Sequence, residues 1–459
     1  MKTLIKNGTV VNATDSIRAD VLIENGIIVA VGTGLDSQDA KIIEATGKYV
    51  FPGAIDPHTH LDMPFGAAST SDNFYSGTKA AVMGGVTTVV DFSIQSKGET
   101  LKQAIANWHK RADGKCFSDY SFHVAVTDCN DAVIAELKTL IEQTGVSTVK
   151  MFLAYKGLFQ IDDGVMLKVF RAARESGVLV GLHCENGDII DVLATEAMAA
   201  GQTAPIYHAL TRPDYIEAEA ITRAAAIADV VGVPLYIVHL SSAKGLAAAL
   251  AARQRGQKIY IETCPQYLLL DDSRYFEPDF GGAKYVMSPP LRKIEDNGII
   301  WQALQDDIVN VVATDHCAFN LADQKQAGRN DFRKIPNGAP GIETRFSLLY
   351  SYGVAEGKIS LNQFVRLLSA EPARTMGMYP QKGTITAGSD ADIVIFNPTG
   401  ECVITATNLH QAVDYTPYEG FVQKGKIEHV LVGGRHVVQN CELVDDQPKG
   451  RFIFRKAVK

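Results

Sequence analysis

The stretch PGAIDPHTH, residues 52–60, marks the place where the pattern of this amino-acid sequence changes. Before it, residues 1–50 alternate between apolar and polar side chains, with Asn7-Gly8 and Asn25-Gly26 as hairpin turn signals. That pattern predicts a meander of short antiparallel strands. Residues 52–383 instead alternate short apolar runs with amphipathic or alanine-rich stretches, which is typical of repeated βα units.

Eight apolar runs of strand length lie in this central region, with helical patterns between them. Eight such units predict a (β/α)8 TIM-like barrel, an α/β fold that carries its catalytic groups at the C-terminal ends of the strands. The expected strands are AIDPHTH (54–60), VTTVVDF (86–92), SFHVAV (121–126), STVKMF (147–152), VLVGLHC (178–184), PLYIVHL (234–240), KIYIETC (258–264) and IVNVVATDH (308–316).

Strand patterns return near the end of the chain, at residues 391–396, 426–439 and 450–454. We therefore expect both termini to pair into one small β-sandwich. The predicted organisation is a discontinuous sandwich domain of residues 1–52 and 385–459, and a metal-dependent barrel domain of residues 53–384.

The composition of the chain excludes several kinds of partner. Its net charge is -8 with a pI near 5.8, and no lysine or arginine cluster offers the basic surface that nucleic acids require. No apolar run approaches the roughly 18 residues of a membrane span, and Asn7 and Gly8 lie where a signal peptide has its apolar stretch. The seven cysteines are scattered without a C-x-x-C pair, which indicates a reducing compartment. We expect a cytoplasmic protein that binds neither nucleic acid nor membranes.

Six side chains that can bind metal ions lie at or near the C-terminal ends of the expected strands. They are His58 and His60 on the first strand, Lys150 on the fourth, His183 on the fifth, His239 on the sixth and Asp315 on the eighth. Because side chains alternate along a strand, His58 and His60 point to the same side and can hold one ion. A single histidine there is more often a hydrogen-bonded core residue. The joint placement of four histidines on three strands predicts a metal centre.

Lys150 interrupts an apolar strand that the barrel buries, between Val149 and Met151. A buried lysine needs a partner, so it either pairs with a carboxylate inside the barrel or reaches the rim. The functional alternative is a neutral amine that reacts with carbon dioxide to form a carbamate, an anion that can bridge two metal ions. With four imidazoles and Asp315, the carbamate makes a nitrogen and oxygen set that suits zinc and also accepts manganese or cobalt.

Several motifs resemble those of the dihydropyrimidinase and D-hydantoinase family, the cyclic amidohydrolases of the amidohydrolase superfamily. The resemblance covers essentially the whole chain and extends to GSDADIVIF (388–396). The other motifs are PGAIDPHTH (52–60), STVKMFLAYKG (147–157), HCENGD (183–188), YIVHLSS (236–242), ETCPQYL (262–268), MSPPLR (287–292), ATDHCAF (313–319) and IPNGAPGIETR (335–345).

The resemblance implies a dinuclear metal site in each subunit of a cytosolic homotetramer. The implied cofactors are two divalent metal ions, zinc by preference, and carbon dioxide bound as N6-carboxylysine at Lys150. Cys184 stands where the family commonly has alanine, and we expect no consequence because strand alternation turns it away from the metals. By position, the buried ion would be held by His58, His60, Lys150 and Asp315, and the exposed ion by Lys150, His183 and His239.

The resemblance also implies contacts with the substrate, a small cyclic amide. Tyr155 matches a tyrosine that hydrogen-bonds the substrate carbonyl, while Ser288 and Asn337 match positions whose main-chain groups hold the ring amide. Considered alone, Tyr155 could instead pack on a loop, and Ser288 could be a turn residue before two prolines. Asp56 is two residues before His58 on the same expected strand, so its side chain points to the same side as His58 and His60. It either orients a ligand or makes a structural hydrogen bond.

The implied reaction is hydrolysis of an unreactive ring amide. A water shared by two metal ions supplies a bridging hydroxide, and the exposed ion polarises the carbonyl. Tyr155 would donate a hydrogen bond to the developing oxyanion, and Asp315 would carry a proton to the departing ring nitrogen. The predicted activity opens a 5,6-dihydropyrimidine such as dihydrouracil, or a 5-substituted hydantoin, to an N-carbamoyl amino acid.

Asp62 lies where dihydroorotase-like relatives usually carry an arginine for a substrate carboxylate. An acid at this position, with the aromatic Phe65, Phe152 and Phe159, favours an uncharged ring over the dihydroorotase and allantoinase alternatives. A non-catalytic scaffold is disfavoured because all six ligands are present. A sugar-phosphate barrel is disfavoured because no glycine-rich phosphate loop follows the seventh or eighth strand. The sequence leaves open the preference between dihydropyrimidines and hydantoins, the stereoselectivity and the native metal.

Overall fold

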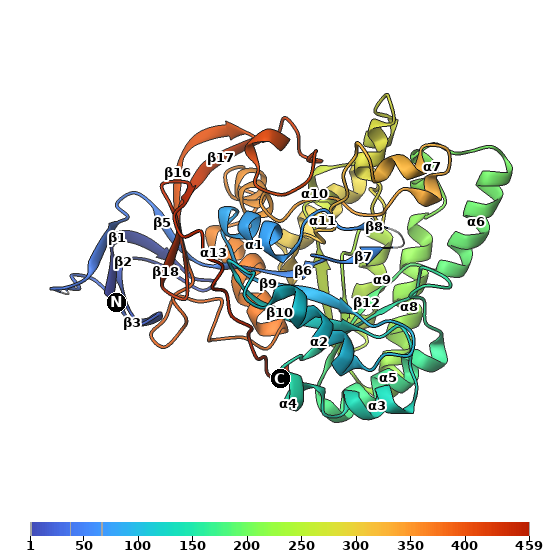
Figure 1. Ribbon diagram of the computed structural model, residues 1–459, viewed down its shortest axis with the longest axis horizontal. Coiled ribbons are helices and arrows are strands. Elements are labelled where there is room, and N and C mark those ends of the chain that lie inside the picture. Colours follow the sequence, from blue (N-terminus) through green and yellow to red (C-terminus); the bar gives the residue numbers. More distant parts are fainter. Residues whose placement is uncertain (1, 37, 66–67, 459) are drawn as a thin grey trace.

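The structure is a computed structural model that describes residues 2–36, 38–65 and 68–458. Eight parallel strands form the centre of the molecule, and each pairs with the next one along the chain (Figure 1). All eight expected strands are confirmed. They are β6 (Ala54–Thr59), β9 (Val86–Ile94), β10 (Asp119–Ala125), β11 (Thr148–Phe152), β12 (Leu179–His183), β13 (Leu235–Ile237), β14 (Ile259–Thr263) and β15 (Val311–Val312).

Contacts between the first strand and the segment after the last strand close this sheet into a barrel. Thr59 and His316 form a parallel bridge, and the His60 amide donates to the His316 carbonyl at 2.8 Å. The Asp56 carboxylate adds a side-chain link, because its Oδ2 accepts from the Thr314 hydroxyl at 2.6 Å. The predicted (β/α)8 fold is confirmed, and closure brings the C-terminal ends of the strands to one rim.

Helices pack around the barrel, and α2, for example, contacts β9 and β10. In α2, Thr100 caps the start in a capping box with Gln103, and Ile105 and Trp108 lie on the buried face. Within the described part of the chain, no helix has the length and apolar character that crossing a membrane requires. The α-helices are α1 (Phe74–Met83), α2 (Leu101–Ala112), α3 (Asp131–Leu137), α4 (Leu140–Thr144), α5 (Asp163–Ser176), α6 (Gly187–Ala199), α7 (Ile206–Leu210), α8 (Asp214–Val231), α9 (Ala243–Gln254), α10 (Gln266–Leu269), α11 (Ile294–Gln305), α12 (Arg345–Leu349), α13 (Leu361–Val365) and α14 (Glu371–Thr375).

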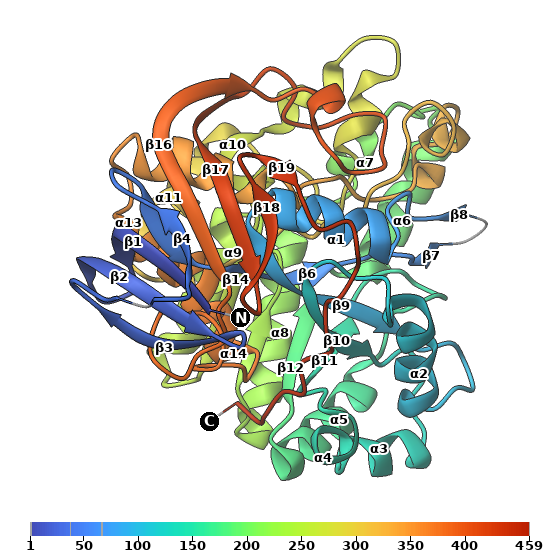
Figure 2. The ribbon, with the colours of Figure 1, turned by 60° about the vertical axis from the view of Figure 1, so that its left-hand side comes forward.

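Strands from both termini form a second sheet of nine strands beside the barrel (Figure 2). The two halves meet where β5 pairs antiparallel with β16, with Val50 opposite Ile395. The expected pairing of the termini is confirmed, and hydrogen bonds join the nine strands into one continuous sheet. The strands are β1 (Lys2–Val11), β2 (Ser16–Glu24), β3 (Ile27–Gly32), β4 (Lys41–Glu44), β5 (Tyr49–Pro52), β16 (Ile393–Val403), β17 (Val422–Val432), β18 (Arg435–Gln439) and β19 (Glu442–Leu443), while β7 (Pro64–Phe65) and β8 (Ala68–Ser69) form a separate hairpin.

The expected turn at Asn7-Gly8 is wrong, whereas the turn at Asn25-Gly26 joins β2 to β3. Asn7 has a φ of 62° inside the continuous strand β1, at an irregularity in the pairing with β2. Its amide donates to Asp20 Oδ1 at 2.8 Å, so a side chain of the neighbouring strand replaces the lost ladder bond. The Asn-Gly pair therefore makes a β-bulge and not a hairpin.

Residues 450–454 do not join the terminal sheet as expected. They lie beside β10, where the Tyr120 amide donates to the Arg451 carbonyl at 3.0 Å and the Ile453 amide donates to the Tyr120 carbonyl at 2.8 Å. Ile453 is buried there with barrel residues such as Ile55, and this burial of apolar surface explains the placement. The division into domains at about residues 52 and 385 stays a prediction.

Candidate metal centre

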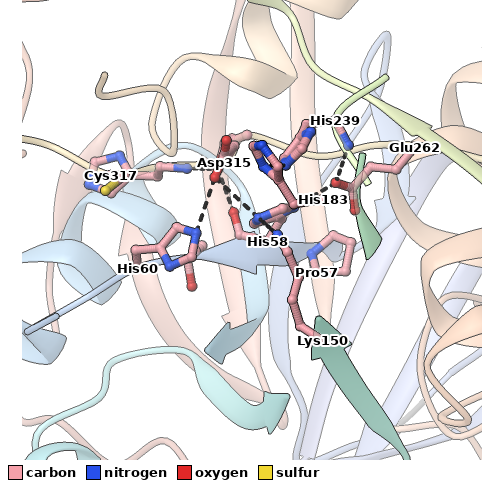
Figure 3. Close-up of polar contacts among 12 residues, drawn as sticks. Pro57, His58, His60, Lys150, His183, His239, Glu262, Asp315 and Cys317 are labelled. Atoms are coloured by element: carbon pink, nitrogen blue, oxygen red, sulfur yellow. Dashed lines mark hydrogen bonds and ion pairs between the residues drawn. The ribbon is translucent and has the colours of Figure 1, made fainter. Parts of the chain in front are cut away.

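The structure brings the six predicted ligand side chains together at the rim of the barrel (Figure 3). Local geometry explains the convergence, because each residue lies on a barrel strand or within three residues of its C-terminal end. Five of the side chains are buried, and Asp315 is partly exposed. His58 lies in β6 with His60 just after it, Lys150 lies in β11, His183 ends β12, and His239 and Asp315 follow β13 and β15.

One set of ligand atoms surrounds the Asp315 carboxylate. Asp315 Oδ1 lies 3.1 Å from His58 Nε2 and 3.2 Å from His60 Nε2. The ligand atoms of these three residues all lie within 4.8 Å of one another, which is close enough to share an ion. Burial lowers the pKa of His60 to about 4, so this imidazole is neutral near pH 7, the form that binds metals. The side chains therefore fit one divalent cation.

A second set is formed by His183 and His239. His183 Nδ1 lies 3.0 Å from His239 Nε2, and burial lowers the pKa of both imidazoles. Because His183 Nε2 lies 2.8 Å from Glu185 Oε2 and donates its proton there, the Nδ1 atom of His183 carries a lone pair. His239 Nδ1 is buried without a hydrogen-bond partner in the described structure. Two neutral imidazoles that face each other in this way fit a second divalent cation.

Lys150 lies next to the first set and lines the same pocket as the second. Its Nζ is 3.2 Å from His58 Nε2 and lies over the rings of Phe92 and Phe152, 4.6 and 5.0 Å from their centroids. The side chain is 1% exposed, and burial lowers the pKa of Lys150 to about 8. Among the described residues no ion pair joins Lys150 to a carboxylate, and Lys150 lines the pocket at the rim; the carbamate stays a prediction.

Two carboxylates support the ligands from behind, and the sequence reasoning did not find them. Glu262 Oε1 accepts from His58 Nδ1 at 2.6 Å and from the His239 amide at 3.0 Å. Glu185 Oε2 accepts from His183 Nε2 and Arg212 Nη1, both at 2.8 Å. Burial raises the pKa of Glu185, but Arg212 and His183 outweigh it and lower the value to about 2. Such partners fix the tautomer and the orientation of ligand histidines.

A signal for Glu262 was present in the sequence. Glu262 is an acid inside the apolar strand KIYIETC. Lys150 was noticed for the same reason, because it is a charged residue inside an apolar strand. Asp56 accepts from the amides of Thr314 and His58 and lies 3.7 Å from the buried Arg345. It therefore bonds the backbone of one ligand residue, His58, and of the residue that precedes Asp315.

Three residues of the site have left-handed backbone conformations that side chains rarely adopt. The φ angles are 67° at Tyr155, 37° at His239 and 53° at Asp315. Each such residue costs about 1–3 kcal/mol, which surrounding contacts must offset, and this kind of strain is concentrated at functional sites. Beside Asp315, the ring of His316 is held by the Gly341 amide at 3.1 Å and by the Asp72 carboxylate at 3.1 Å.

A pocket opens onto the ligand cluster, and the three predicted substrate contacts line it. Tyr155, Ser288 and Asn337 lie in its wall, and Asn337 Nδ2 donates to Ser288 Oγ at 3.0 Å. Burial raises the pKa of Tyr155 to about 12, so its hydroxyl keeps its proton near neutral pH. Phe65, Phe152 and Phe159 complete the apolar part of the wall.

Asp62 is not among the described residues that line this pocket. Its carbonyl oxygen accepts from Arg111 Nη1 at 2.6 Å. The expected uncharged substrate is therefore supported by the aromatic side chains in the wall and not by repulsion from this acid.

Comparisons with known proteins agree with this geometry. The model of the amidohydrolase family matches residues 49–437. A D-hydantoinase of Geobacillus stearothermophilus is 49% identical over 455 residues, which cover 99% of this chain and 97% of the relative. Among solved structures, the dihydropyrimidinase of Brevibacillus agri NCHU1002 is 50% identical and covers 100% of both chains with a TM-score of 0.99. The L-hydantoinase (dihydropyrimidinase) of Arthrobacter aurescens is 28% identical, with 99% of both chains covered and a TM-score of 0.90. On this evidence the chain belongs to the amidohydrolase family, in the group of hydantoinases and dihydropyrimidinases.

Proposed function

We propose that this chain hydrolyses the ring of cyclic amides, either 5,6-dihydropyrimidines such as dihydrouracil or 5-substituted hydantoins, to N-carbamoyl amino acids. The observation that carries the proposal is the convergence of six ligand side chains at one end of the barrel. Five of them line a pocket whose wall is otherwise largely apolar, and the sixth, His58, lies against Asp315. The names of the relatives, D-hydantoinase and dihydropyrimidinase, support the same reaction.

We infer two divalent ions, zinc by preference, in each subunit, and the two ligand sets support this inference. His58, His60, Lys150 and Asp315 would hold the first ion, and Lys150, His183 and His239 would hold the second. When bound, such ions supply a hydroxide near neutral pH and a Lewis acid for the carbonyl. The protein adds ligand orientation through the Glu262 and Glu185 carboxylates.

Lys150 would serve both ions as a carbamate. The neutral amine attacks carbon dioxide, an N–C bond forms, one C=O electron pair moves onto oxygen, and the nitrogen loses a proton. The amine is available for this step because burial lowers the pKa of Lys150 to about 8. The carbamate anion would also suit this buried position better than a protonated lysine, because the metal ions would repel an ammonium group.

Three groups of the protein would act on the substrate itself. Tyr155 keeps its proton near neutral pH and can donate it in a hydrogen bond to the carbonyl oxygen as charge develops there. Burial raises the pKa of Asp315, but the nearby histidines hold it well below its usual value, so the group is an ionised carboxylate near neutral pH. In that form it has the lone pairs to take a proton and pass it to the ring nitrogen. The main-chain groups of Ser288 and Asn337 would hold the ring amide.

Side-by-side rates on dihydrouracil, hydantoin, allantoin and dihydroorotate test the proposal, with Lys150→Ala as the inactive control. We expect turnover of dihydrouracil or hydantoin, with N-carbamoyl products identified by mass spectrometry. Turnover of allantoin or dihydroorotate alone would move the assignment to another cyclic amidohydrolase. Activity on none of the four by zinc-, manganese- or cobalt-loaded protein would reject it.

We also propose that the protein is a homotetramer in the cytoplasm. It is supported by the family resemblance and by the scattered cysteines. Light scattering of the purified protein tests the assembly: a mass near four times 49.7 kDa is expected, and a monomeric mass would contradict it.

A further inference from the structure

Lys325 is a buried lysine that the proposed reaction does not use. It opens η3 (Lys325–Gly328), a short helical turn that follows the eighth barrel strand, and its side chain is fully buried. Its Nζ donates to the Val286 carbonyl at 3.2 Å and to the Pro336 carbonyl at 3.0 Å. Within the described part of the chain it forms no ion pair with a carboxylate, and burial lowers the pKa of Lys325 to about 7. A lysine kept inside a protein without an acid needs another explanation.

The two carbonyls belong to the two loops that carry the ring-binding positions. Val286 lies two residues before Ser288, and Pro336 immediately precedes Asn337. The loops also contact each other directly, because the Gly338 amide donates to the same Val286 carbonyl at 2.9 Å. Lys325 therefore bonds to both loops at once, next to the residues that line the pocket.

Close packing holds the Ser288 and Asn337 loops in place. Gly338 has a φ of 140°, and a Cβ atom there would lie 2.2 Å from the Cys317 carbonyl oxygen, so the loop backbone packs directly on the segment after Asp315. On the other loop, His208 Nε2 lies 2.8 Å from the Met287 carbonyl and donates to it. Small shifts of either loop would therefore change the spacing between Ser288 and Asn337.

We propose that Lys325 is a positioning residue for substrate recognition, which holds the Ser288 and Asn337 loops at the separation that the ring amide requires. The inference rests on the proposed function and extends it to a residue outside the pocket. The chemistry matches the contacts: a lysine Nζ carries at least two N–H groups in either protonation state, and two carbonyl acceptors face it. Since the loops would bind the ring in the ground state and the transition state alike, Lys325 should act on KM and not on kcat.

Lys325→Met tests the proposal, because methionine fills similar space but donates no hydrogen bond. The two carbonyls then lose their buried donor, and we expect KM for the preferred cyclic amide to rise about 10-fold. Turnover at saturation should stay within about threefold of the wild type, and metal content should not change, because no ligand contacts Lys325. Hydrogen exchange should become faster in the segments 284–290 and 335–341.

Lys382→Met is the matched control. Lys382 is also a buried lysine, but it pairs with Asp119 at 2.8 Å and with Asp390 at 3.2 Å, where the barrel meets the terminal sheet. We expect this variant to lower the Tm without a change in KM or in exchange of the two loops. A KM that rises equally in both variants would show a general loss of stability and overturn the proposal.

A folded Lys325→Met enzyme with the KM of the wild type would also overturn it, whatever its Tm. If Lys325→Met does not fold, Lys325→Leu takes its place, because leucine also donates no hydrogen bond, and an unchanged KM in that variant counts against the proposal in the same way. If the wild type opens no cyclic amide, the proposed function fails separately, and loop exchange alone decides whether Lys325 holds the two loops.

Discussion

Glu262→Gln tests whether the carboxylate behind the metal centre orients its ligands. Glu262 bonds two ligand residues, the His58 side chain at 2.6 Å and the His239 amide at 3.0 Å. A hydrogen bond to a charged group contributes about 1.5–3 kcal/mol, and a neutral one about 0.5–1.5 kcal/mol. Glutamine keeps an oxygen for these donors but loses the charge, so each bond weakens by about 1 kcal/mol. The sum of about 2 kcal/mol corresponds to roughly 30-fold weaker metal binding, within the usual range for such partners.

Competition with a chelator, followed by metal analysis of the protein, measures this effect. Tyr236 donates to Glu262 Oε2 at 2.6 Å and can rotate its hydroxyl to accept from the new amide, so we expect the fold to be retained. Glu343→Gln is the control. Glu343 lies 2.7 Å from His410 Nδ1 and contacts none of the six ligand residues, so this substitution should leave the metal affinity unchanged. A folded Glu262→Gln protein that binds metal within about twofold of the wild type would refute the reasoning, since the lost charge predicts about 30-fold.

Three substitutions test the groups assigned to the reaction. Lys150→Ala should lose metal and activity together, whereas bicarbonate should speed metal reconstitution of the wild-type apoprotein; a fully active Lys150→Ala enzyme would reject the carbamate. Asp315→Asn should lower turnover by at least about 100-fold, the scale of general acid-base catalysis, even after metal content is restored, and retained turnover with metal bound would place the base elsewhere. Tyr155→Phe should lower kcat on the order of 10²- to 10³-fold, and the loss is smaller if the exposed metal also stabilises the oxyanion. The change in KM should be smaller than the change in kcat. A rise in KM alone would make Tyr155 a plain binding contact.

Local patterns were sufficient to predict most of the fold. Every barrel strand was visible as a short apolar run, because a strand buried on both faces needs apolar side chains along its whole length. The six ligand-type residues could be grouped from the sequence because they occur near strand ends, and barrel closure brings those ends to one rim. Lys150 could be singled out because a charged side chain in such a run is costly.

Contacts between distant segments caused the errors. The Asn7-Gly8 pair has the composition of a hairpin turn, but the Asp20 side chain binds the Asn7 amide and keeps the strand continuous as a bulge. Residues 450–454 have a strand pattern, but Ile453 is buried against the barrel and not against the terminal sheet. Both outcomes depend on which neighbour is present, and periodicity carries no such information.

The sequence by itself determined the barrel, the pairing of the two termini and the kinds of side chain at the rim, because periodicity and strand-end position are local properties. Only the tertiary structure decided which groups support those side chains. Glu262 bonds His58 across 204 residues, and Lys325 reaches the Val286 carbonyl across 39. In the sequence, Lys325 stands in the polar segment ADQKQAG, where a lysine is usually exposed. Its burial, and with it the proposed role in holding two loops, follows from packing that no local pattern encodes.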